Sequence, residues 1–294
     1  NVFVSGALSS EVDGARSWLN NADRLYQLPL GLVGVAIGVA LLPALSRAVQ
    51  ADDKDGAQAT MDEALGFAMA LTLPATAALV TIPFFLIDGL FTRGQFTAYD
   101  ARMTGDLLFH FGWGVPAFVL TRVLAPAFFA RQDTKGPMWF ALASVVVNLA
   151  VAVSLFHLIG VTGLAIGVSA AAWVNVGLMV FTLKRRGLWN PSKDARRRMG
   201  MIVLSSILMG VFFWLCDRYR PDLEALLRPE AIPALGPKEI AILAVCFAGL
   251  IVYALMLILT RAITPREIRA ALRRRPAPAG SEGQGGGGLP PGLD

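Results

Sequence analysis

Charged residues are scarce in this chain of 294 residues: Asp, Glu, Lys and Arg make up 16% of it, and hydrophobic residues 55%. Soluble domains carry charge on about a quarter of their residues. The charges here are also clumped, so long uncharged runs separate them, and this pattern predicts a membrane protein. The net charge of +5 does not indicate nucleic-acid binding, because the basic residues lie beside the apolar runs, where they act as topology determinants.

Groups for bond chemistry are equally few. The two cysteines, Cys216 and Cys246, and the two histidines, His110 and His157, form no spacing typical of a disulfide framework or a metal site. The sequence contains no G-x-S-x-G, no P-loop G-x-x-x-x-G-K-[ST] and no H-E-x-x-H. We therefore expect a protein that binds and moves a molecule, not an enzyme, with no cofactor apart from a coupling cation considered below.

Seven apolar runs are close to the roughly 20 residues needed to cross about 30 Å of hydrocarbon. The backbone must form its hydrogen bonds within each segment there, so the runs are predicted to be helices. The predicted spans are 17–47, 64–87, 107–130, 137–158, 163–183, 199–216 and 240–260. Residues 1–9, which begin with Asn inside an apolar stretch, are interpreted as the end of a further span in a longer protein. The predicted fold class is an all-α, polytopic helix bundle with seven transmembrane helices plus the end of an eighth.

Lys and Arg are distributed unequally between alternate connections, about two to one. The richer set is expected to be cytoplasmic, which places the C-terminus inside the cell. The transmembrane part is predicted to cover residues 1–262, with a short interfacial helix at Leu223–Leu227 in an outer loop. Residues 263–275 are predicted to form a basic amphipathic cytoplasmic segment, and residues 276–294 to be disordered.

The first predicted helix carries a polar and small-residue face. Its members are spaced by three or four residues and so share one side of a helix: Asn20, Arg24, Gln27, Gly31, Gly34 and Gly38. The glycines are interpreted either as a close-packing stripe or as the wall of a cavity. Arg24 lies about two turns inside the helix, where an arginine marks a cavity or pathway; the alternatives are snorkelling to the outer surface and pairing with an acid such as Asp23.

Three further polar residues fall inside predicted spans. Arg122 lies nine residues before Arg131, about 13 Å deeper along a helix, and is expected either to reach the inner interface or to line the same cavity. Asn148 and Asn175 lie near the centres of their spans. Each is interpreted as a hydrogen-bonding bridge between helices, and a cation site is the alternative, although hard cations need several oxygen ligands.

Three stretches carry a resemblance to a known family. WLNNADRLYQLPLGLVGVAIGVALLPALSR (18–47), FTRGQFTAYDARMT (91–104) and RVLAPAFFARQDTKGP (122–137) are similar, in this order and spacing, to segments of the MurJ (also MviN) lipid II flippases. These belong to the MOP transporter superfamily. The similarity runs from residue 1 to about residue 262.

The resemblance implies a fold of about fourteen helices in two lobes, of which this chain would be the end of the seventh helix and the eighth to fourteenth. It implies transport of a lipid-linked peptidoglycan precursor across the bacterial cytoplasmic (inner) membrane by alternating access, with the missing N-terminal lobe as partner. The arginine of the ADRL motif, here Arg24, would help to bind the pyrophosphate in a cationic cavity. We therefore predict a substrate-binding set of Arg24, Asn20, Gln27 and Arg122.

Two departures from the family pattern are visible. Gln27 stands where some members have an acid, so no protonation role carries over to it. Some members hold sodium in this lobe, and Asn148 matches one such ligand, but Ala152 stands one turn later, where a second ligand is expected. Asn148 is thus the single candidate metal ligand, for sodium. Two other functions remain open: another MOP-superfamily flippase of polyprenyl-lipid oligosaccharides, and a membrane scaffold subunit that does not transport.

Overall fold

The computed structural model describes residues 14–226 and 236–260, and within these residues it contains helices and no strands. The predicted all-α, polytopic class is confirmed. The helices are α2 (Ala15–Gln50), α3 (Lys54–Thr81), α4 (Pro83–Phe91), α5 (Ala98–Gly112), α6 (Val115–Phe129), α7 (Lys135–Ile159), α8 (Thr162–Arg185), α9 (Lys193–Arg218), α10 (Arg220–Leu226) and α11 (Pro237–Leu259). The expected span end at 1–9, the amphipathic segment at 263–275 and the tail at 276–294 lie outside the described residues.

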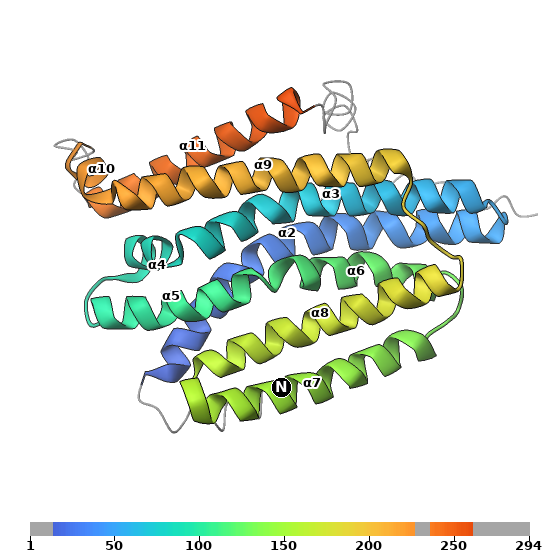
Figure 1. Ribbon diagram of the computed structural model, residues 1–294, viewed down its shortest axis with the longest axis horizontal. Helices are drawn as coiled ribbons and strands as arrows, with labels where there is room; N and C mark the ends of the chain where they lie inside the picture. The colour runs from blue at the N-terminus through green and yellow to red at the C-terminus, as the bar shows by residue number, and fades with distance from the viewer. Residues whose placement is uncertain (1–13, 227–235, 261–294) are drawn as a thin grey trace, which may run out of the picture. The chain divides into compact units, whose positions relative to one another are not determined.

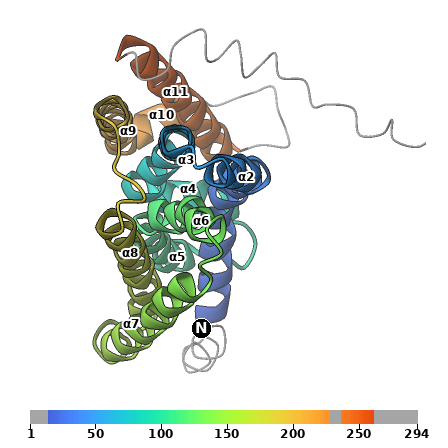
Figure 2. The ribbon, with the colours of Figure 1, turned by 90° about the vertical axis from the view of Figure 1, so that its right-hand side faces the viewer.

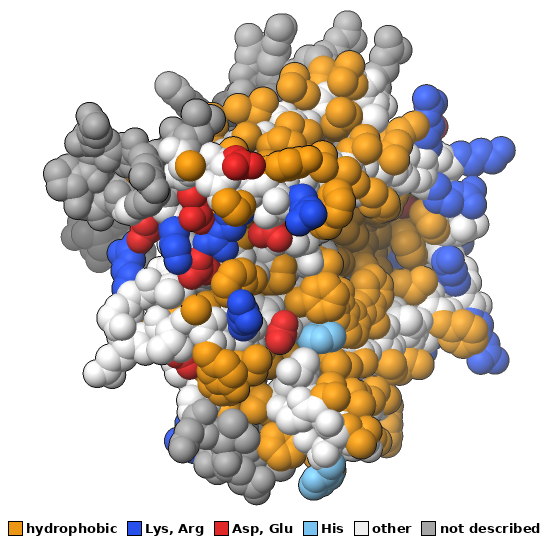
Figure 3. Space-filling view, turned by 60° about the vertical axis from the view of Figure 1, so that its left-hand side comes forward, with side chains coloured by type: hydrophobic (Ala, Val, Ile, Leu, Met, Phe, Trp, Pro, Cys, Tyr) orange, Lys and Arg blue, Asp and Glu red, His pale blue; other side chains and the backbone are white. Residues whose placement is uncertain are grey.

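Six stretches of the described chain are long and apolar enough to cross a membrane: 54–81, 98–129, 135–159, 162–185, 193–218 and 238–259. The long helices run roughly alongside one another, as the two views turned by 90° show (Figure 1 and Figure 2). The sequence places a further crossing on α2, because residues 25–46 are uncharged. This helix has 36 residues, and several of its side chains are not described. Lys and Arg side chains gather at one end of the bundle in Figure 3, and the other end carries charges of both signs.

Two of the predicted spans are interrupted helices. The span at 64–87 breaks at Ile82, between α3 and α4, and the span at 107–130 breaks at Trp113 and Gly114, between α5 and α6. Pro83 and Pro116 stand within the first two positions of the second segments, where a missing N–H costs least. Unpaired carbonyls are costly at membrane depth, and those freed at the second break accept hydrogen bonds from α8.

The two donors on α8 are Ser169 and Trp173. The hydroxyl of Ser169 donates to the His110 carbonyl at 2.7 Å, and the indole N–H of Trp173 donates to the Trp113 carbonyl at 3.0 Å. The break therefore replaces hydrogen bonds within one helix by hydrogen bonds to a neighbouring helix. This fixes α8 against the joint between α5 and α6.

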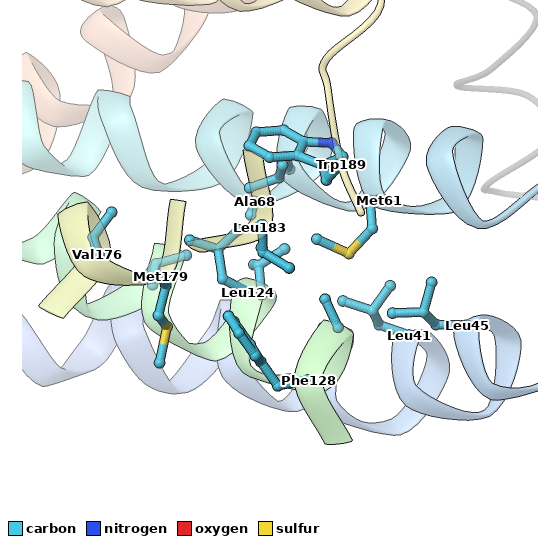
Figure 4. Close-up of a cluster of buried hydrophobic side chains, with 14 of the residues drawn as sticks. Leu41, Leu45, Met61, Ala68, Leu124, Phe128, Val176, Met179, Leu183 and Trp189 are labelled. Carbon is cyan, nitrogen blue, oxygen red and sulfur yellow. The ribbon is translucent and has the colours of Figure 1, made fainter. Parts of the chain in front are cut away.

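The core lies between α2, α3, α6 and α8. Leu45, Leu124, Phe128 and Leu183 are almost fully buried in it, and Trp189 from the α8–α9 connection packs against the same cluster (Figure 4). The indole N–H of Trp189 donates to Asp62 on α3 at 3.0 Å. A connection that would otherwise be mobile is thereby fixed to the bundle.

An ion-pair network around the buried Asp88 joins α4, α10 and α11 at the end opposite the basic one. Asp88 pairs with Arg220, and its carboxylate lies 3.1 Å from the Lys238 ammonium. Burial by itself would raise the pKa of Asp88, but the hydrogen bonds from Arg220 and Lys238 outweigh it and lower the pKa. A short helix was expected at Leu223–Leu227; α10 begins three residues earlier, at Arg220, and residue 227 lies outside the described residues. The ion pair of Arg220 with Asp88 holds α10 against α4.

Candidate functional site

The rotation of α2 about its axis is set by aromatic contacts with α5 and α6. The indole N–H of Trp18 donates to Asp100 at 2.8 Å, and the Tyr26 ring stacks on Phe111 with the centroids 4.8 Å apart. Ala22, between them in the same stripe, is fully buried. These residues are four apart and so form one face of the helix, which faces the bundle.

The predicted polar face of α2 points the other way. Asn20, Arg24, Gln27 and Gly31 are all exposed. Gln27 donates a hydrogen bond to Asp23, whereas Arg24 forms no ion pair or hydrogen bond with the described part of the chain. A methyl group added at Gly31 would meet nothing within 4 Å. Among the described residues the Arg24 guanidinium thus forms no ion pair, even with the adjacent Asp23, and Arg24 lies on an exposed face of α2.

Arg122 reaches the same helix from α6. Its guanidinium lies over Gly34, because a Cβ added there would stand 2.2 Å from Nη1 of Arg122. Arg122 also forms no hydrogen bond or ion pair within the described residues. Of the two positions left open by the sequence, the structure places its side chain beside α2, next to the glycine face. Two arginines that have no acidic partner within the described residues therefore lie along α2: Arg122 beside Gly34, and Arg24 nearly three turns before it.

A polar cavity of about 290 Å³ adjoins Arg122. It lies between α6, α7 and α8, with one residue of α2 at its edge, and its lining consists of Leu30, Phe118, Thr121, Arg122, Ser144, Val168, Ala171, Ala172 and Asn175. The predicted site set contained only Arg122 from this lining. The sequence favours a helix bridge for Asn175, and its motifs do not point to Ser144 or Thr121.

A signal for this cavity was present in the sequence. Arg122 is nine residues before Arg131, Ser144 nine residues after Lys135, and Asn175 nine residues before Lys184. Each basic residue marks the same end of the bundle, so the three polar residues lie at one depth, about 13 Å along their helices. Comparing depths across spans, instead of treating each polar residue alone, would have grouped them.

A larger groove of about 530 Å³ between α3 and α9 is apolar. Leu73, Val80, Ile207 and Trp214 are among its lining residues. The hydroxyl groups of Thr81 and Ser206, which also line it, donate to carbonyls of their own helices. The groove therefore provides no cation and is unsuited to an anionic headgroup, in contrast to the smaller polar cavity.

Asn148 lies apart from the polar cavity, in the interface between α7 and α8. Its side chain is 5% exposed, and its Oδ1 accepts no hydrogen bond from the described residues. A Cβ on Gly167 would stand 2.9 Å from this oxygen and 3.0 Å from Ala152. The described residues contain no group of three or more His, Cys, Asp or Glu suited to a metal ion. One amide oxygen surrounded by Gly167 and Ala152 is a poor oxygen set for a cation.

The turn between α6 and α7 is held by Asp133. Its carboxylate accepts from the Gly136 amide at 2.9 Å and pairs with Arg186 at the end of α8 at 2.5 Å. The Gly136 hydrogen bond and then the Arg186 guanidinium hold the pKa of Asp133 below its usual range. The RQDTKG segment thus ties together the ends of the three helices that enclose the polar cavity.

The fold and this site define a polytopic helical membrane protein, in which Arg24 of α2 and Arg122 of α6 form no ion pair within the described residues and a cavity with four polar lining residues adjoins Arg122. The chain belongs to the lipid II flippase MurJ family, whose profile matches residues 1–223. It is 37% identical over 282 residues to the probable lipid II flippase MurJ of Rhizobium tropici, covering 95% of this chain and 52% of that protein. The corresponding protein of Rhizobium meliloti is 39% identical over 210 residues, which are 71% of this chain and 39% of that protein.

A solved structure of a lipid II flippase MurJ in an inward closed conformation shares the fold. The TM-score is 0.65 at 21% sequence identity, over 84% of this chain and 47% of that chain. The chain therefore spans about half the length of the relatives that it matches.

Proposed function

We propose that this chain is the C-terminal lobe of a lipid II flippase that moves lipid-linked peptidoglycan precursor across the bacterial cytoplasmic membrane by alternating access. One observation supports the proposal beyond family membership: Arg24 and Arg122 lie along α2 and have no acidic partner in the part of the chain that the structure describes, and Asn20, Arg24 and Gln27 are exposed. An intramembrane arginine facing lipid is costly, whereas one facing a water-filled cavity is not. The exposed face of α2 is therefore suited to line a cavity shared with an N-terminal lobe.

In this proposal the two arginines bind the pyrophosphate of the substrate. A guanidinium can donate two parallel hydrogen bonds to phosphate oxygens and stays charged at all physiological pH values. Asn20 and Gln27 provide neutral hydrogen-bonding groups on the same face. The protein acts here as a transporter, not as an enzyme, and sodium at Asn148 remains a weaker proposal for the coupling cation.

The lobe assignment is tested by complementation. Alternating access needs two bodies that move against each other, so the chain alone should insert into the membrane but fail to rescue cells depleted of their flippase. Co-expression with the N-terminal lobe should restore growth. Rescue by the chain alone would contradict the proposal.

A reconstituted flipping assay separates the competing functions. The two lobes together should move lipid II faster than other polyprenyl-linked oligosaccharides. A preference for the oligosaccharide lipids would indicate another MOP-superfamily flippase, and the absence of any flipping would indicate a scaffold subunit.

The proposed orientation places the basic end of the bundle and the C-terminus in the cytoplasm. With Cys216 and Cys246 replaced, a cysteine at Ala98 should react with an impermeant thiol reagent added outside the cell, and a cysteine at Ser192 should not. Labelling at Ser192 but not at Ala98 would show that the orientation is the reverse of the proposed one.

A further inference from the structure

The polar cavity between α6, α7 and α8 contains one cation and several hydrogen-bond acceptors. The hydroxyl of Thr121 donates to the Ala117 carbonyl and that of Ser144 to the Ala141 carbonyl, each at 3.0 Å. Each hydroxyl donates its single hydrogen within its own helix, which leaves its oxygen lone pairs for a ligand. The cavity therefore presents acceptors on α6 and α7 beside the guanidinium of Arg122.

Asn175 adds a third acceptor from α8. Its Oδ1 is buried and accepts no hydrogen bond from the described residues, although it lines a cavity that also contains Arg122. Buried polar atoms in native proteins nearly always have a partner. Asn175 itself lines the cavity, so a rotation of its side-chain amide would bring the unpaired Oδ1 to an O–H or N–H donor of a ligand.

The size and depth of the cavity restrict the ligand. At about 30 Å³ for each water molecule, its volume of about 290 Å³ corresponds to roughly ten waters, which is enough for one sugar ring or one phosphate group with its neighbours. The polar residues lie about 13 Å from the basic end, close to the middle of a bilayer about 30 Å thick. Transporters commonly place substrate sites at this depth.

We infer that this cavity is a binding subsite for a phosphate ester with adjacent hydroxyl or amide donors, in which Arg122 binds the phosphate and Asn175, with Ser144, accepts from the donors. The inference rests on the proposed function, which assigns Arg122 to the pyrophosphate, and adds a contact that recognises the group next to it. Two membrane components have this chemistry: the first sugar of lipid II beside its pyrophosphate, and the glycerol headgroup of phosphatidylglycerol.

Binding to the two purified lobes together, in phosphatidylcholine nanodiscs, tests the subsite. The probes are lipid II, undecaprenyl pyrophosphate, which has the phosphates without the sugar, and phosphatidylglycerol. Asn175→Leu replaces the amide by an apolar group of similar volume. Lipid II binding should weaken about fivefold to tenfold, as expected for the loss of one or two buried hydrogen bonds. Its binding of undecaprenyl pyrophosphate should be unchanged, whereas Arg122→Gln should weaken both lipids.

Two more variants separate a binding role from a structural one. Ser144→Ala should not destabilise α7, because Ala favours a helix more than Ser does. It should weaken lipid II binding about twofold to fivefold. Ser206→Ala removes a similar helix-bonded hydroxyl from the apolar groove on α9 and should change nothing. If Asn175→Leu and Ser144→Ala weaken all three lipids equally, or weaken none, the subsite does not exist.

The source of the ligand follows from the same measurements. If Asn175→Leu weakens the binding of phosphatidylglycerol alone, the subsite has the proposed chemistry and its ligand is a membrane phospholipid. Failure of the proposed function would appear elsewhere, as the absence of lipid II flipping by the two lobes while the Asn175-dependent binding persists.

Discussion

The contact between Arg122 and Gly34 gives the sharpest test of the candidate site. In the Gly34→Ala variant the new methyl group would stand 2.2 Å from Nη1 of Arg122, and ordinary contact begins at 3.4 Å, so Nη1 must move by about 1.2 Å. The Cζ and Cδ atoms of Arg122 are already at 3.3 and 3.4 Å. The guanidinium must therefore leave its position over Gly34.

This displacement should reduce transport without harming the fold. Hydrogen bonds between guanidinium and phosphate are about 2.7–2.9 Å long, so a shift of about 1.2 Å breaks them. A charge-assisted hydrogen bond contributes about 1.5–3 kcal/mol, equivalent to roughly a tenfold to hundredfold loss of affinity. The atom that must yield is the end of a flexible side chain, and Ala favours a helix over Gly by about 1 kcal/mol, so protein levels should not fall.

Gly31→Ala is the matched control. It makes the same change on the same helix, and its methyl group would meet nothing within 4 Å. Lipid II flipping by the two lobes together should fall at least tenfold in Gly34→Ala and stay unchanged in Gly31→Ala. Adding Gly34→Ala to an Arg122→Ala background should have no further effect, because the clashing group is gone. Equal flipping by the two single variants would refute the placement of Arg122 or its role.

Three other predictions concern separate residues. Arg24→Ala should reach normal levels in the membrane yet fail to support growth, and Arg24→Lys, which keeps the charge without the forked geometry, should be intermediate; full growth of Arg24→Ala would exclude it from the site. Asn148→Ala should leave any sodium dependence of flipping unchanged, and a clear loss of that dependence would instead make Asn148 a ligand. A carboxyl with a lowered pKa, such as Asp133, stabilises the fold above its unfolded-state pKa, and this contribution is lost as the pH falls through its folded-state pKa. Between about pH 5 and pH 3 the melting temperature of Asp133→Asn should therefore vary less than that of the parent, and identical profiles would contradict the ion pair with Arg186.

The sequence by itself determined the class of the protein. Uncharged runs of membrane-spanning length allow only helices, because lipid offers the backbone no hydrogen-bond partners, and this constraint is local to each segment. The polar face of α2 was also predictable from spacing alone, since residues three and four apart share a side of a helix. The ADRL and RQD segments were sufficient to indicate the family before any contact was known.

Only the tertiary structure decided what surrounds these residues. The break at Trp113 depends on a neighbouring helix as well as on Pro116, because Ser169 and Trp173 of α8 donate hydrogen bonds to the carbonyls that the break frees. The sequence leaves two positions open for the Arg122 side chain, the inner interface and the cavity. Gly34, on a different helix, has no side chain, and this leaves room for the Arg122 guanidinium beside α2. Asn148 and Asn175 look alike in sequence, yet one lies against Gly167 and the other lines the polar cavity. Helix periodicity fixes which face a side chain occupies, whereas the neighbour of that face depends on how distant segments pack.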